Sequence, residues 1–148
     1  MVEITRHFTS TVLIVHQDRV LLHHHKKRGA LLPVGGHLER DELPQDAALR
    51  EVKEETGLSI ELYNPDSLNF SDVQSLVRPV HMLLIDMNPY HQHIDFIFYA
   101  TAKTNQVQPA NGESALLHWY DRDELLAAAM PENVRGLALE ALELLGQS

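Results

Sequence analysis

The chain has 148 residues, with 12 Lys and Arg against 21 Asp and Glu, for a formal net charge of −9. A chain of this length buries about 68–70% of its unfolded surface, so we expect one domain over residues 1–148. The absence of cysteine from the sequence excludes a disulfide scaffold, a thiolate metal site and a cysteine nucleophile. The acidic balance argues against broad nucleic-acid or anionic-membrane binding, because both require a cationic footprint.

The first residues do not have the pattern of a secretion signal. Their apolar run, Val12 to Val15, is short, and His16-Gln17-Asp18 follows it in place of a small-residue cleavage site. No window approaches the roughly 18 apolar residues of a membrane-spanning helix. We therefore expect a cytoplasmic protein.

The first predicted elements are two strands. Residues 10–16 and 19–25 are rich in β-branched residues and leucine, and Gln17-Asp18 between them predicts a hairpin. Residues 29–43, which contain glycines and a proline, are predicted to be irregular.

A helix is predicted over residues 44–56. Pro44 suits its first position, and Gly57 suits a left-handed residue just past its end. Its apolar arc, which we expect to pack on a sheet, consists of Ala48, Leu49 and Val52.

The rest of the chain predicts mostly strands and then two helices. Strands are predicted at residues 58–63, 79–87, 91–101 and 116–120, with loops at 64–78 and 102–115. Asp121 and Glu124 resemble a capping box before a short helix, and residues 132–145 predict an amphipathic helix. This order predicts a mixed sheet covered by helices, in the α/β or α+β class.

Three carboxylates share one side of the predicted helix. Glu51, Glu54 and Glu55 fall within an arc of about 100°. Like-charge pairs at this spacing cost about 0.2–0.5 kcal/mol each, and Arg50 can relieve them only in part. A hard cation such as Mg²⁺, which prefers oxygen ligands, would neutralise the group. The alternative is a solvated acidic face, the usual role of a charge run.

The segment before the helix fits the same idea. Gly35-Gly36 would let the backbone adopt strained dihedral angles and approach a ligand closely, so that a carbonyl could complete a metal shell. Glu42, just before the helix, could reach the same cluster.

Residues 36–58 resemble the Nudix box of the Nudix hydrolase family. The family pattern is Gly, five residues, Glu, seven residues, Arg-Glu, an apolar residue, any residue, Glu-Glu, any residue, Gly and an apolar residue. The positions that fill it are Gly36, Glu42, Arg50, Glu51, Val52, Glu54, Glu55, Gly57 and Leu58. One departure lies outside the fixed positions, because Leu43 stands where many members have a Ser or Thr helix cap.

This resemblance implies a Nudix-type α/β/α sandwich with a mixed β-sheet flanked by helices. It also implies hydrolysis of the pyrophosphate bond in a nucleoside diphosphate linked to another moiety, in a reaction that depends on Mg²⁺ or, in some members, on Mn²⁺. By position, the metal ligands would be Glu51, Glu54, Glu55 and the carbonyl of Gly35 or Gly36. The partner would be a small nucleotide-type molecule, and a homodimer is possible.

The resemblance also implies catalytic roles. Arg50 would orient the carboxylates, and Glu42 would be an outer ligand or an accessory base. The base that accepts a proton from water is Glu51 in some members and a distant loop glutamate in others. Glu113 is the candidate for the distant role, and the alternative for it is an exposed loop carboxylate.

Two further groups are candidate substrate contacts. His93 and Asp95 share one face of the strand at 91–101 with His91, which could line a polar pocket, hold zinc or form an ordinary hydrogen-bonded sheet face. Lys27 and Arg28 end the most basic stretch of the chain, which could contact phosphate or be an exposed strand end.

Two other classes of function remain open at this point. A Nudix-fold sensor would bind a metabolite without cleaving it, and loss of a box glutamate would favour it, but every box glutamate is present. A structural domain with an acidic helix would leave the glycine pair and the spacing unexplained.

Overall fold

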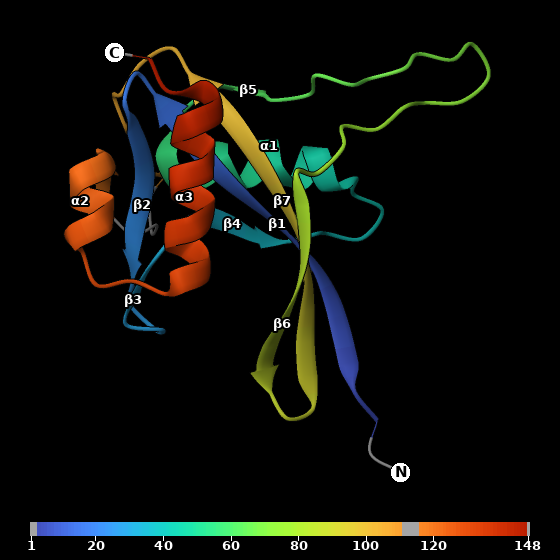
Figure 1. Ribbon diagram of the computed structural model, residues 1–148. Coiled ribbons are helices and arrows are strands. Elements are labelled where there is room, and N and C mark those ends of the chain that lie inside the picture. The colour runs from blue at the N-terminus through green and yellow to red at the C-terminus, as the bar shows by residue number, and fades with distance from the viewer. Residues whose placement is uncertain (1–2, 111–115, 148) are drawn as a thin grey trace.

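A computed structural model describes residues 3–110 and 116–147 and shows an eight-stranded mixed sheet with helices on both faces (Figure 1). The strands are β1 (Thr5–His16), β2 (Arg19–His25), β3 (Ala30–Leu32), β4 (Val34–His37), β5 (Ile60–Leu62), β6 (His81–Asn88), β7 (His91–Ala102) and β8 (Leu117–Tyr120). The helices are α1 (Pro44–Thr56), α2 (Arg122–Ala127) and α3 (Glu132–Leu145). In the described part of the chain, no helix is both long and apolar enough to cross a membrane.

Strand β1 organises the sheet. It pairs antiparallel with β2 near its end and with β4 near its middle, and it runs parallel to β7 along most of its length. Strands β5 and β6 pair with β7, and β3 and β8 pair with β2. The α/β prediction, with a mixed sheet flanked by helices, is confirmed.

The alternation of β1 and β7 divides the core into two parts. Val12 and Phe98 face the side covered by α1, whereas Leu13 and Tyr99 face the side covered by α2 and α3. Figure 1 shows α1 behind the sheet and α3 in front of it. The residues that position the site are therefore held between two packed layers.

Two predictions about strands are wrong. Residues 29–43, predicted to be irregular, contain β3 and β4, and β1 begins at Thr5 rather than at residue 10. β3 pairs locally with β2, whereas β4 and the start of β1 form strands by pairing with segments distant in the sequence. β4 takes its strand form from β1, and the polar start of β1 takes its form from β7.

Helix α1 has the predicted ends. Gly57 adopts a left-handed conformation with φ of 76°, and its N–H donates to the carbonyl of Lys53. Leu43 at the start makes no side-chain cap. The predicted capping box of Asp121 and Glu124 is confirmed at the start of α2.

The buried side of α1 differs from the predicted apolar arc. Leu49 is 41% exposed, whereas Ala47 is fully buried. The sheet-facing arc is therefore centred closer to the carboxylates than predicted, and Glu51 leans toward the sheet with only 16% of its side chain exposed. Leu49 lies about 100° from Ala48 around the helix and points away from the sheet.

Candidate active site

The glycine pair of β4 lies at the centre of the site. The N–H of Gly35 donates to Oε2 of Glu55 at 2.9 Å. A Cβ atom at Gly36 would overlap the carboxylate of Glu51, and one at Gly35 would overlap the carbonyl oxygen of Ser10. Neither glycine has a positive φ. The prediction of strained dihedral angles is therefore wrong, and the glycines are needed because other groups approach them closely.

Arg50 links Glu42, which precedes α1, to carboxylates on the helix. Its guanidinium donates to both carboxylate oxygens of Glu42, at 2.8 and 2.9 Å, and to Oε1 of Glu51 at 3.0 Å. It also donates to Glu54 at 3.3 Å and to the backbone carbonyl of His37 at 3.0 Å. A planar guanidinium suits this arrangement because its donors are fixed in a fork. The hydrogen bonds from Arg50 lower the pKa of Glu42, and those to Glu42 and Glu51 raise the pKa of Arg50.

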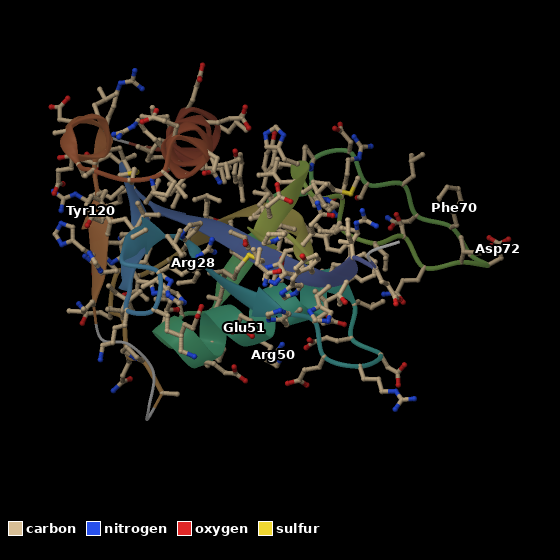
Figure 2. All side chains as sticks on the ribbon, turned by 90° about the horizontal axis from the view of Figure 1, so that it is seen from below. Arg28, Arg50, Glu51, Phe70, Asp72 and Tyr120 are labelled. Atoms are coloured by element: carbon tan, nitrogen blue, oxygen red, sulfur yellow. The ribbon has the colours of Figure 1, made fainter. Side chains whose placement is uncertain are left out.

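These hydrogen bonds hold three carboxylates beside β4. We call Glu51, Glu54 and Glu55 the acidic cluster. Arg50 Nη1 contacts both Glu51 and Glu54, while Glu55 is fixed by Gly35. Figure 2 shows Arg50 and Glu51 together beside α1. Several carboxylate oxygens close together form a donor set that fits a hard divalent cation better than a soft transition metal.

A pocket of about 470 Å³ opens on the other side of the glycine pair. Its lining includes Gly35, Gly36, Arg28, His93 and Asp95, so the three predicted substrate residues lie together next to the predicted metal carbonyls. Residues from β6 and α3 close the far wall, among them Leu83, Ile85, Val134 and Leu137. Because glycine has no side chain, little more than the backbone of β4 separates this pocket from the acidic cluster.

Asp95 is held more tightly than the sequence indicated. It is 5% exposed, and its carboxylate accepts hydrogen bonds from the hydroxyls of Thr9 and Thr11, each at 2.9 Å. Burial raises the pKa of Asp95, while the two threonine hydroxyls act in the opposite direction. The sequence analysis missed both threonines, although the parallel register places Thr9 directly opposite Asp95.

The remaining predicted residues are distributed as follows. Arg28 and Lys27 are exposed and lie in the turn after β2, at the rim of the pocket. Figure 2 places Arg28 above Glu51 and far from Phe70 and Asp72 on the long loop. Glu113 lies outside the described residues.

A larger cavity, of about 820 Å³, lies just past the C-terminal end of α1. Its lining includes Gly57, Leu58, Lys103 and Gln147. It does not include the acidic cluster or the glycine pair. Of these two cavities, the smaller one is the one whose lining includes the glycine pair that the carboxylates contact.

Comparison with known proteins agrees with this arrangement. The family model of the NUDIX domain matches residues 5–140. The crystal structure of a hydrolase of the NUDIX family from Clostridium perfringens is 46% identical, with a TM-score of 0.89, and the match covers 96% of this chain and 99% of that one.

Two curated relatives match over shorter regions. The m7GpppN-mRNA hydrolase NUDT17 of Danio rerio is 35% identical over 99 residues, which are 62% of this chain and 32% of that protein. A probable DHNTP pyrophosphohydrolase of Lactococcus lactis is 27% identical over 107 residues, which are 69% of this chain and 58% of that protein. The matches thus span about a third and somewhat over half of these relatives. On the family match, which extends over most of the sequence, this chain belongs to the NUDIX family of hydrolases.

Proposed function

We propose that the protein hydrolyses the pyrophosphate bond of a nucleoside diphosphate linked to another moiety, in a reaction that depends on Mg²⁺. The observation that carries this proposal is the meeting of the acidic cluster with the glycine edge of β4, beside a pocket with a basic rim. Carboxylates alone would repel an anionic substrate, so a cation between them is required.

The metal site in this proposal consists of Glu51, Glu54, Glu55 and the carbonyl of Gly35 or Gly36. The contact between Gly35 N–H and Glu55 fixes one carboxylate, and the close approach of Glu51 to Gly36 fixes a second. Glu54 is the most exposed of the three glutamates, with 47% of its side chain exposed. Mg²⁺ bound there would neutralise the pyrophosphate and lower the pKa of an attacking water, and Mn²⁺ has the same preference for oxygen ligands.

The chain itself supplies orientation and a proton acceptor. Arg50 holds Glu51 through Oε1, the carboxylate oxygen that also lies nearest to Gly36. Glu51 or Glu54 then accepts the proton of the attacking water, and Glu113 remains the candidate for a distant base. Because Glu42 is already engaged by two hydrogen bonds from Arg50, its proposed role is to position Arg50.

The pocket is the proposed place of the nucleotide or of its linked moiety. Arg28 at the rim has a charge suited to phosphate, and His93 inside offers a neutral ring at pH 7 because burial lowers its pKa to about 4. Asp95 lines the wall, and its bonds to Thr9 and Thr11 make it a rigid acceptor for a substrate hydroxyl or amino group. Since nucleotides of this kind are intracellular metabolites, we place the reaction in the cytoplasm.

We also propose a homodimer. The half of the sheet that extends beyond the helices in Figure 1 has an apolar face, with Phe8 53%, Met82 67% and Leu84 60% exposed. A second copy covering this face would bury it. Sedimentation velocity of the protein and of a Met82→Asp, Leu84→Asp variant tests this, and a monomeric wild type would overturn it.

The activity is tested by screening a panel of nucleotide derivatives with Mg²⁺, with Mn²⁺ and with a chelator. Products are separated by chromatography, and the reaction is run in water labelled with heavy oxygen. We expect cleavage only with a divalent cation and the label in a phosphate product, since water attacks phosphorus. Tight binding of a nucleotide without turnover would overturn the proposal and favour a sensor.

A further inference from the structure

Four histidines meet on one face of the sheet although they come from three strands. His7 lies on β1 and is the register partner of His93 on β7, and His91 lies two residues before His93 on the same face. His37 at the end of β4 is opposite Thr9, which places it diagonally next to His7. We call His7, His37, His91 and His93 the histidine cluster.

The rings are close enough to share one ligand. One ring nitrogen from each of the four lies within 4.8 Å of those of the other three. The ring centroids of His37 and His93 are 4.7 Å apart, and those of His91 and His93 are 4.9 Å apart. Nε2 of His91 contacts Nδ1 of His7 at 2.9 Å, a hydrogen bond in which one of the two nitrogens carries the proton.

One member of the cluster has a buried nitrogen without a hydrogen-bond partner among the described residues. Nε2 of His93 is buried and has no hydrogen-bond partner among residues 3–110 and 116–147. Buried polar atoms without partners are rare in native proteins because each costs free energy. The unpaired nitrogen is therefore a second observation, independent of the spacing, that indicates a missing ligand. Burial and the neighbouring rings of His37, His91 and His7 favour neutral His93, which is the form that binds metals.

We propose that the histidine cluster binds one transition-metal ion of the zinc class through four imidazole nitrogens. Imidazole suits zinc, copper and nickel, whereas Mg²⁺ prefers oxygen, so this site would take a different ion from the acidic cluster. Tetrahedral zinc at about 2.0–2.1 Å from each nitrogen needs nitrogens about 3.3 Å apart. His7 and His37 are exposed, and inward rotation of their rings would bring the four nitrogens to this distance.

The bound ion would join β1, β4 and β7 at the end of the sheet where β1 begins. It would also fix His37, whose backbone carbonyl accepts a hydrogen bond from Arg50. The inference concerns binding alone and does not depend on hydrolysis, so it can fail while the proposed function stands, and the reverse also holds.

The test uses the full chain with excess Mg²⁺ present, so that hard-cation sites are occupied. Co²⁺ is titrated first, because tetrahedral nitrogen coordination gives intense visible bands that carboxylate coordination does not. Zn²⁺ affinity and stoichiometry are then measured by competition with a chromophoric chelator. We expect one equivalent of Co²⁺ with intense bands, displaced by one equivalent of Zn²⁺.

Three variants locate the site. His37→Ala and the double variant His7→Ala, His91→Ala should each weaken Zn²⁺ binding by at least tenfold, with circular dichroism confirming that they fold. The matched control is His24→Ala, an exposed histidine on β2 outside the cluster, which should leave binding unchanged. Three results would overturn the proposal. They are an equal weakening of Zn²⁺ binding by His24→Ala, the absence of the intense Co²⁺ bands, and loss of Zn²⁺ binding in Glu54→Gln rather than in the histidine variants.

Discussion

The acidic cluster lies against Gly35 and Gly36 of β4, the histidine cluster includes His37 at the end of the same strand, and the two clusters differ in how their charge is compensated. The acidic cluster contains its own cation, because Arg50 contacts Glu51 and Glu54 directly. In the histidine cluster, burial and neighbouring rings lower the pKa of His37 and His93, which favours the neutral form of these two rings. A site that keeps negative charge is suited to hard cations, and a site that keeps neutral nitrogen lone pairs is suited to borderline ones.

The largest expected effect is a loss of activity on substitution in the acidic cluster. Glu54→Gln should lower kcat by about 100-fold or more, because it removes a proposed ligand and proton acceptor. Its free energy of unfolding should change by less than about 0.5 kcal/mol, since the exposed pair with Arg50 contributes little. Steady-state kinetics and urea unfolding measure both. Glu143→Gln, an exposed glutamate on α3, is the matched control, and equal activity in the two variants would defeat the ligand assignment.

The next effect compares the two glycines. In Gly36→Ala the new methyl group meets the movable carboxylate of Glu51, so kcat should fall about tenfold while stability changes by less than about 1 kcal/mol. In Gly35→Ala the methyl group meets the backbone of Ser10 and Thr11, so stability should fall by about 1–3 kcal/mol. Thermal unfolding and kinetics on both variants are the measurement. A Gly36→Ala enzyme with unchanged kcat would show that Glu51 needs no fixed position.

The third effect concerns the histidine cluster without metal. Burial, then His37, His91, His7 and Arg28, lower the pKa of His93 from 6.5 to about 4. Between these pH values the unfolded chain binds a proton at His93 that the folded chain does not. The contribution of His93 to the free energy of unfolding is therefore fully present above about pH 6.5 and is lost as the pH drops toward 4.

Urea unfolding in chelator at pH 7 and pH 5 checks this. The wild type should lose about 1–2 kcal/mol more than His93→Gln over this interval. Equal losses would mean that the folded protein protonates His93 as readily as the unfolded chain does.

The smallest effect concerns the basic rim of the pocket. Arg28→Ala, alone or with Lys27→Ala, should raise KM about three- to tenfold with little change in kcat, because the side chains contact the substrate outside the reacting bond. Lys26→Ala, exposed in the same turn but not in the pocket lining, is the control. An unchanged KM in Arg28→Ala would remove it from the substrate site.

Much of this arrangement follows from local patterns in the sequence. The ends of α1 were predictable because Pro44 and Gly57 act within one turn, and the spacing of the glutamates places them on one helix side. Strand β4 was not predictable from its four residues, two of which are glycine, because it takes its form from β1.

The histidine cluster shows the same limit. His91 and His93 have an evident strand spacing, but His7 is 84 residues from His91, and only the parallel register brings them together. The prediction that Leu49 packs on the sheet was wrong for a related reason. The position of the sheet, rather than the helix pattern, decides which side of the helix is buried.

The parallel ladder between β1 and β7 has a consequence for how the chain is made. Thr9 and Asp95 are joined across 86 residues, so this contact cannot form during synthesis until most of the chain has left the ribosome. Helix α1 is complete long before, but Phe98 and Ala100, which share its apolar cluster, arrive only with β7. High sequence separation of this kind slows folding. The acidic face of α1 would keep the waiting segment hydrated, and the same charges that serve catalysis would limit self-association of the nascent chain.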